Sequence, residues 1–195
     1  MFGTLLLLFI FGVTRSWAVD YEMLIEDPDI FSPCTEGPPD SITVQEAFNF
    51  DDLTISMESD TLHVSGNATV KWEAQPTDKI VVQIDILHFN RGFWEPTVFS
   101  MSTQDFCASM YDKNQYWFKY WTTFITNRDE VESQCLATGT FLVHEPFDVR
   151  FKMMNYRGPE LRGRYKMVIT IKALHKKLPR PSSICMEIRG EVFKA

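Results

Sequence analysis

Residues 61–74 decide the fold class of this chain, and they read TLHVSGNATVKWEA. Every second residue from Leu62 to Ala74 is apolar or small, and the residues between them are polar. A period of two is typical of a β-strand with one buried face and one solvent-exposed face. The stretch therefore predicts a long strand that belongs to a half-buried sheet.

The same alternation recurs in other parts of the chain. It is found at Ile42 and Val44, Leu53 to Met57, Ile80 to Ile86, Tyr165 to Ile171, and Ile184 to Val192. Turn-forming residues such as Glu58-Ser59-Asp60 and Pro179 to Ser183 separate these runs. Many short strands at this spacing predict an all-β sandwich or barrel, built as one domain.

One aromatic-rich segment, residues 106–124, departs from the alternation. Its apolar residues at helical spacing are Phe106, Met110, Trp117, Trp121 and Phe124. Ser102 followed by Asp105 resembles a capping box at the start of a helix. Two interpretations are open: the helix plugs one end of the sandwich, or its rings form a lid or rim over an apolar cavity.

The first eighteen residues have the features of a secretory signal peptide. Leu5 to Phe11 are all apolar, and Ser16-Trp17-Ala18 places small residues at the −3 and −1 positions of a cleavage site. A run of seven apolar residues is too short to cross a bilayer, which takes about 20. We therefore expect cleavage after Ala18 and a secreted, extracellular domain formed by residues 19–195.

The cysteine content fits an exported protein. Four cysteines in such a chain predict two disulfides, and spacing alone allows three pairings. The chain has no Cys-x-x-Cys pair, which argues against a thioredoxin-type redox site or a common zinc ribbon. The sequon Asn67-Ala68-Thr69 predicts a glycan on Asn67.

Composition and motifs argue against several functional classes. The formal net charge of −7 disfavours nucleic-acid binding, which requires clustered cations. The sequence contains no Gly-x-Ser-x-Gly, His-Glu-x-x-His or glycine-rich phosphate-loop motif, and its four histidines lie far apart. We therefore expect no enzymatic activity, no cofactor and no metal site.

A basic loop precedes the last predicted strand. Its cationic and titratable residues are Lys172, His175, Lys176, Lys177 and Arg180. Cations near an anionic lipid surface each contribute about 1 kcal/mol to binding. Peripheral membrane contact and an ordinary solvated turn are the two interpretations of this loop.

Residues 104–193 resemble a known family. The features that carry the resemblance are, in chain order, Cys135, Thr138 to Val143, Pro146 to Val149, Leu161 to Tyr165, and Cys185 in a last strand that ends Glu187-Ile188-Arg189-Gly190. This order is similar to that of ganglioside activator-like members of the ML lipid-recognition superfamily. It is more similar still to that of the insect CheB-type secreted chemosensory proteins.

The resemblance implies a fold and a disulfide pairing. The fold is an immunoglobulin-like two-sheet β-sandwich of the ML type, with one short aromatic-rich helix between strands. The implied bridges are Cys34 to Cys185 and Cys107 to Cys135. The ganglioside activator has two further bridges that this chain lacks, so its loop geometry does not transfer to residues 93–121.

The resemblance also implies a function: binding of a lipid or a pheromone-like hydrophobic ligand between the sheets, with a membrane receptor or channel as a further partner in contact-pheromone detection. The chain has more large apolar residues than one inner face requires. The residues expected at the cavity or its mouth are Phe93, Trp94, Trp117, Phe118, Trp121 and Phe124. The alternative is a secreted interaction module with a solid core, which acts as a receptor accessory factor.

Overall fold

The computed structural model describes residues 18–27 and 29–195, so the predicted signal peptide lies outside the described residues except for Ala18. Most of the described strands belong to one large sheet, sheet A, with the order β10-β1-β13-β11-β7-β8. Its main strands are β10 (Lys152–Tyr156), β1 (Val19–Ile25), β13 (Ser183–Lys194), β11 (Gly163–His175), β7 (Lys79–Asn90) and β8 (Phe93–Thr103). Short strands β2 (Ser32–Pro33) and β3 (Ser41–Ile42) pair with β13, and β12 (Leu178–Pro179) pairs with β11.

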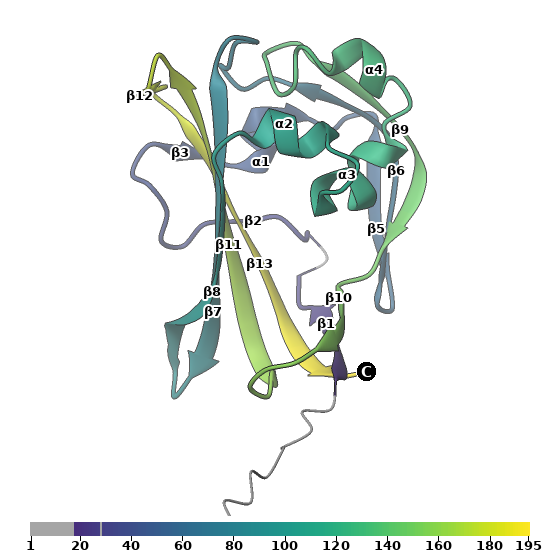
Figure 1. The fold of residues 1–195 in the computed structure, drawn as a ribbon, viewed down its shortest axis with the longest axis vertical. Coiled ribbons are helices and arrows are strands. Elements are labelled where there is room, and N and C mark those ends of the chain that lie inside the picture. Colours follow the sequence, from purple (N-terminus) through teal and green to yellow (C-terminus); the bar gives the residue numbers. More distant parts are fainter. Residues whose placement is uncertain (1–17, 28) are drawn as a thin grey trace, which may run out of the picture.

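A smaller sheet, sheet B, faces sheet A across the core (Figure 1). It consists of β4 (Phe48–Asn49), β6 (Thr61–Val70), β5 (Leu53–Glu58) and β9 (Phe141–Val149), with β6 in the middle. All of these pairings are antiparallel. The prediction of an all-β two-sheet sandwich is thus confirmed.

Alternation sets the two faces of β11, a central strand of sheet A. Ile169, Ile171 and Ala173 are buried on the inner face, whereas Lys172 between them is exposed. Ile169 lies opposite Ile84 of β7. The inner face of sheet A therefore supplies a continuous aliphatic layer to the core.

Strand β6 follows the predicted alternation but contains an irregularity at Gly66. This residue has φ of +104°, and a Cβ atom there would overlap the carbonyl oxygen of Asp52. The strand ends at Val70, earlier than predicted, although Trp72 and Ala74 remain buried beyond it. At position 66 the register with β9 shifts, and the positive φ of the backbone at this bulge requires glycine.

The strand predicted at Ile42 and Val44 is confirmed at Ile42, which lies in β3, but it is wrong from Val44 onward. Residues 44–47 form a one-turn helix, α1 (Val44–Ala47), which Thr43 caps. The Thr43 hydroxyl accepts from the Glu46 backbone N–H, and the Glu46 carboxylate accepts from the Thr43 backbone N–H at 2.7 Å. This reciprocal capping box outweighs the short apolar alternation.

The aromatic segment is helical, as predicted, but it is divided into short pieces: α2 (Phe106–Tyr111), α3 (Tyr116–Tyr120), the 3₁₀ turn η1 (Thr122–Phe124), and then α4 (Arg128–Val131). Asp105 caps α2 by accepting from the Ala108 N–H, so the cap lies three residues later than Ser102. The carboxylate of Asp112 accepts from the Asn114 N–H at 2.9 Å, which forms a turn that ends α2. Figure 1 shows α2 and α3 between the upper parts of the two sheets.

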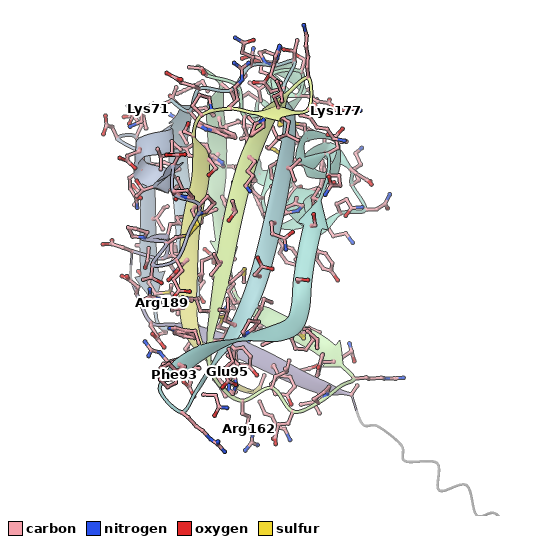
Figure 2. All side chains as sticks on the ribbon, turned by 90° about the vertical axis from the view of Figure 1, so that its left-hand side faces the viewer. Lys71, Phe93, Glu95, Arg162, Lys177 and Arg189 are labelled. Atoms are coloured by element: carbon pink, nitrogen blue, oxygen red, sulfur yellow. A yellow bond between two sulfur atoms is a disulfide. The ribbon has the colours of Figure 1, made fainter. Side chains whose placement is uncertain are left out.

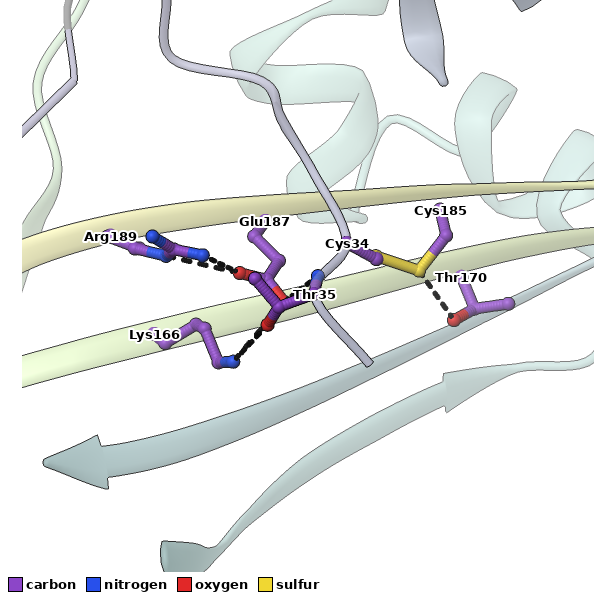
Figure 3. Close-up of a disulfide and its surroundings, with 7 residues drawn as sticks. All are labelled: Cys34, Thr35, Lys166, Thr170, Cys185, Glu187 and Arg189. Carbon is purple, nitrogen blue, oxygen red and sulfur yellow. Dashed lines mark hydrogen bonds and ion pairs between the residues drawn. A yellow bond between two sulfur atoms is a disulfide. The ribbon is translucent and has the colours of Figure 1, made fainter. Parts of the chain in front are cut away.

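Both disulfides have the predicted pairing. Cys34 bonds to Cys185 and Cys107 bonds to Cys135, each with Cα atoms 5.7 Å apart. The first bridge ties the segment after β2 to the outer face of β13 (Figure 3). The second joins α2 to the loop that precedes β9. It therefore fixes both ends of the helical segment, which runs from α2 to α4.

Candidate functional site

The upper half of the space between the sheets is the end nearer α2 and β12 in Figure 1. Buried side chains fill it. Its buried residues include Val82, Ile84, Ile169, Ile171, Ala68, Val70 and Leu142. Helix α2 adds Phe106 and Met110, spaced four residues apart on its buried side. This half is a packed hydrophobic core, and α2 is part of it.

The lower half of the same inner faces combines buried apolar side chains, Leu62, Phe147 and Ile188, with others that are only partly buried. The partly buried ones are Met167 in sheet A, and Ile55, Met57, Val64 and Val149 in sheet B. Met167 lies two residues from buried Ile169, on the same face of a strand that is flanked on both sides. An inner-face residue of a central strand keeps accessible surface only where the opposite sheet does not cover it. The two inner faces are therefore incompletely covered in this half.

Two of these partly buried residues are methionines, and a third partly buried methionine, Met186, lies opposite Ile169 at the upper boundary of this half. Met57 comes from sheet B, and Met167 and Met186 come from neighbouring strands of sheet A. The methionine side chain is unbranched and polarisable, so it adapts to surfaces of irregular shape. The lower half thus has a lining that can repack around a bound apolar molecule.

Two of the predicted aromatic site residues gather around Phe106. The Trp117 ring meets the Phe106 ring edge to face, with centroids 5.0 Å apart. The Trp121 ring is stacked at 6.5 Å from the same phenylalanine. Both tryptophans are partly buried and pack against the core. The helical segment is therefore held by ring contacts rather than by its own short helices.

Trp121 is also bonded to sheet B. Its indole N–H donates to Nε2 of His144 in β9, at 3.1 Å. Because an indole nitrogen only donates, Nε2 of His144 must be unprotonated. His144 is 7% exposed, and burial lowers its pKa from the usual value, although the nearby Gly66 backbone raises it. The imidazole is therefore neutral at pH 7 and links α3 to the sheet.

Phe124 makes a further ring contact between the helical segment and β9. It stacks nearly parallel on Phe147 of β9, with centroids 4.4 Å apart. Phe118 is half-buried on α3. Four of the six predicted site residues thus belong to the helical segment beside β9.

Phe93 and Trp94 lie elsewhere, at the β7–β8 hairpin at the lower end of the molecule (Figure 2). Phe93 is 74% exposed. Trp94 packs on Phe89 at 5.0 Å, with the Lys166 ammonium 5.1 Å from its ring centroid. Hence the six predicted residues do not form one site, and these two are separate from the helical segment.

The lower-half residues and His144 were not predicted as site residues. Alternation already assigns Met57 and Met167 to inner faces, so their position was open to prediction. Their incomplete coverage depends on the distance between the sheets, which leaves no local pattern in the sequence. His144 shows no motif either, because its partner Trp121 is distant in sequence.

A surface cavity of about 340 Å³ lies beside the Cys107–Cys135 bridge. Its lining includes Asp78, Asp105 and Glu132 together with Lys79. This cavity is polar and lies outside the space between the sheets. It does not match the apolar site that the sequence predicts.

The basic loop is partly committed to contacts within the molecule. Arg180 donates to the buried Asp78 carboxylate at 2.8 and 2.9 Å, and the His175 ring lies 3.1 Å from the same group. The hydrogen bond from Arg180 is the main cause of the lowered pKa of Asp78. Lys176 and Lys177 remain exposed at the tip of the turn. The cationic surface available to a membrane is thus smaller than the sequence predicts.

Two features are absent from residues 18–27 and 29–195. There, no group of three or more His, Cys, Asp or Glu side chains is placed to hold a metal ion. The same residues contain no helix of the length and hydropathy needed to cross a membrane. Asn67 is partly buried on β6 opposite Val143, and glycosylation there stays a prediction.

The chain is similar in structure to solved proteins. No family model matches the chain, and no curated protein matches it. Among solved structures, the chain is similar to the crystal structure of chicken MD-1 complexed with lipid IVa, at 10% identity and a TM-score of 0.29. The alignment covers 90% of this chain and 96% of that one.

Proposed function

We propose that this protein binds one long-chain hydrophobic ligand between the lower halves of sheets A and B, without transforming it chemically. The observation that supports this proposal is the partial exposure of inner-face apolar residues, with Met167 as the clearest case. Burial of such residues by a ligand removes apolar surface from water on both sides, and this transfer is favourable.

The free energy gained when the alkyl chain of a ligand leaves water is large enough for useful affinity. Each methylene group that leaves water contributes about 0.8 kcal/mol. A ten-carbon chain therefore supplies roughly 8 kcal/mol before the costs of association and ordering. The methionine-rich lining accommodates chains of different shape, which favours a class of ligands over a single compound.

The helical segment is the proposed rim of this site. Trp117, Trp121 and Phe124 hold α3 and η1 against Phe106 and β9 through ring contacts. Short helices with few backbone bonds open more easily than the sheet core does. In this proposal, ligand enters when the segment moves and is retained when it closes.

The proposed setting is extracellular chemosensation. Residues 104–193 resemble ganglioside activator-like and CheB-type secreted proteins, and two disulfides suit an oxidising compartment. The proposed ligands are accordingly lipids or pheromone-like hydrophobic compounds, with a membrane receptor or channel as a further partner.

A second candidate function has an observation of its own. Strand β8 lies at one edge of sheet A, and its Val98 and Phe93 side chains are 90% and 74% exposed. An exposed edge with apolar side chains is a surface that a receptor ectodomain can extend by strand pairing. In that case the protein acts as an accessory module, and its core needs no ligand.

Delipidated recombinant protein tests the proposed function. Titration with the fluorescent probe N-phenyl-1-naphthylamine should show saturable binding at one site, and native mass spectrometry before delipidation should detect bound lipid. Absence of saturable uptake, together with an apo mass, would contradict the carrier function and favour the accessory module.

A further inference from the structure

The lower end of the inner face of sheet A is polar, unlike the rest of that face. Moving down β11, the inward-facing residues are Ile171, Ile169, Met167 and then Tyr165. Tyr165 lies opposite His88 of β7, and their ring centroids are 4.7 Å apart. Hydrogen-bonding groups therefore appear just beyond the partly exposed methionine.

Sheet A curls on itself at this end. Phe99 belongs to edge strand β8 and Tyr156 belongs to β10 at the opposite edge, yet their ring centroids are 6.3 Å apart. Tyr21 of β1 packs edge to face on Tyr156 at 5.8 Å. The curl brings aromatic residues from both edges together, and they close the lower end of the inner face. We name this group the floor cluster; its members are Tyr21, His88, Phe99, Tyr156 and Tyr165.

The loop that joins β10 to β11 supports the floor cluster from below. Leu161 of this loop is buried, and its N–H donates to the Tyr21 hydroxyl at 3.2 Å. Gly158 and Gly163 lie against the Tyr156 hydroxyl and against Nε2 of His88, where a side chain would crowd them. The backbone of this loop and that of the first residue of β11 thus lie close against the polar ends of Tyr156 and His88.

Three polar groups of the floor cluster have capacity to bind a ligand. Within residues 18–27 and 29–195, the hydroxyls of Tyr156 and Tyr165 and the ring of His88 have no hydrogen-bond partner among side chains or backbone. All three residues are half-buried. Burial, with smaller effects from Tyr156 and Tyr21, raises the pKa of Tyr165, so its hydroxyl keeps its proton at neutral pH.

The cations of β11 face the opposite side of the sheet. Arg164 pairs with Glu26, and Lys166 donates to buried Glu187 at 3.2 Å. The floor cluster therefore offers hydroxyl and ring donors and acceptors without a lysine or arginine side chain among them. Such a set suits an uncharged oxygen-containing group better than a carboxylate or a phosphate.

We propose that the floor cluster binds the uncharged oxygenated end of the ligand, such as that of a long-chain alcohol, aldehyde or ester, while the alkyl chain extends upward past Met167. Tyr165 is the specificity-determining residue, since its ring lies 4.7 Å from that of His88 and it precedes Met167 by two residues on the same face of β11. This inference rests on the proposed function, and it adds that a plain hydrocarbon or an anionic fatty acid is a poorer ligand.

The test uses three twelve-carbon competitors that differ only at one end. Full-length mature protein is loaded with N-phenyl-1-naphthylamine, which is then displaced by 1-dodecanol, dodecane or dodecanoate. Dodecanol should bind on the order of 10-fold more tightly than dodecane, because its hydroxyl pairs with otherwise unpartnered groups. Dodecanoate should bind more weakly than dodecanol at pH 8.

Variants assign the preference to residues. Tyr165→Phe and, separately, Tyr156→Phe should each lower the affinity for dodecanol by about 3- to 10-fold and leave that for dodecane unchanged. Tyr116→Phe, which removes an exposed hydroxyl on α3, is the matched control and should change neither. Thermal unfolding of each variant verifies that it is folded.

The outcomes separate the two proposals. If dodecane and dodecanol displace the probe equally well, the floor cluster does not select the head group, although the carrier function stands. If Tyr165→Phe weakens both competitors alike, Tyr165 has only a structural role and the inference is overturned. If the probe itself does not bind, the proposed function fails first.

Discussion

Glu187 is the residue whose loss should cost the most stability, because its carboxylate compensates two cations on the outer face of sheet A. It accepts from Lys166 and Arg189 and from Thr35, and its side chain is fully buried (Figure 3). Burial alone would raise its pKa, but hydrogen bonds from these neighbours lower the pKa overall. Glu187→Gln would leave the Lys166 ammonium buried and uncompensated.

We expect Glu187→Gln to reduce the free energy of unfolding by about 3–5 kcal/mol, measured by urea denaturation. The control is Glu26→Gln, which removes the partner of Arg164 at the surface and should cost at most about 1 kcal/mol. Equal effects of the two changes would show that burial does not make the pair of Lys166 and Glu187 more important to stability than a surface pair.

His144 should make stability depend on pH. Burial lowers its pKa in the folded state, so the unfolded chain takes up a proton first as pH falls below the ordinary value of 6.5. Stability is therefore complete above that value and is lost as pH falls toward the folded pKa. Protonation at Nε2 would also place two N–H groups face to face at the contact with Trp121.

The expected loss for wild type between pH 7 and pH 5.5 is on the order of 1 kcal/mol. Changes in tryptophan fluorescence should accompany it as Trp121 leaves His144. In His144→Phe, both effects should be absent in this pH range. An equal loss in this variant would show that His144 is not its cause.

At the scale of the element, the Cys107–Cys135 bridge should control the helical segment. The chain-entropy estimate for this loop gives up to about 3.5 kcal/mol. We expect the double variant Cys107→Ser/Cys135→Ser to lose stability by up to that amount. Hydrogen exchange should become faster in α2, α3 and η1 and remain slow in β11. Uniformly faster exchange would show that the bridge stabilises the whole sandwich rather than this segment.

The elements themselves were largely predictable from residues 61–74 and similar runs, because alternation reports directly which face is buried. Two errors have local physical causes. The capping box of Thr43 and Glu46 turns a short apolar run into helix α1. Asp112 accepts from the backbone of Asn114 and divides the predicted aromatic helix into α2 and α3. In both places a polar side chain bonds to nearby backbone, and this outweighs the apolar spacing.

At the scale of the whole molecule, the candidate site could be predicted only in part. Spacing places Trp117 and Trp121 on one helical face, and the structure brings both to Phe106. The curl of sheet A and the partial exposure of Met167 follow from the separation and twist of the layers. Neither leaves a signal in any short stretch of sequence. For this reason the sequence did not show that Phe93 and Trp94 lie at the β7–β8 hairpin, apart from Trp117 and Trp121.

The most direct test of a ligand space between the sheets is a comparison of two substitutions on one face of β11. Met167→Trp adds bulk to the partly exposed half, and Ile171→Trp adds it to the packed half. We predict that Met167→Trp changes the free energy of unfolding by less than about 1 kcal/mol and lowers probe affinity at least about 10-fold, whereas Ile171→Trp costs about 1–3 kcal/mol or more. If Met167→Trp is as destabilising as Ile171→Trp and leaves probe binding intact, the lower half is a filled core and the protein does not carry a ligand there.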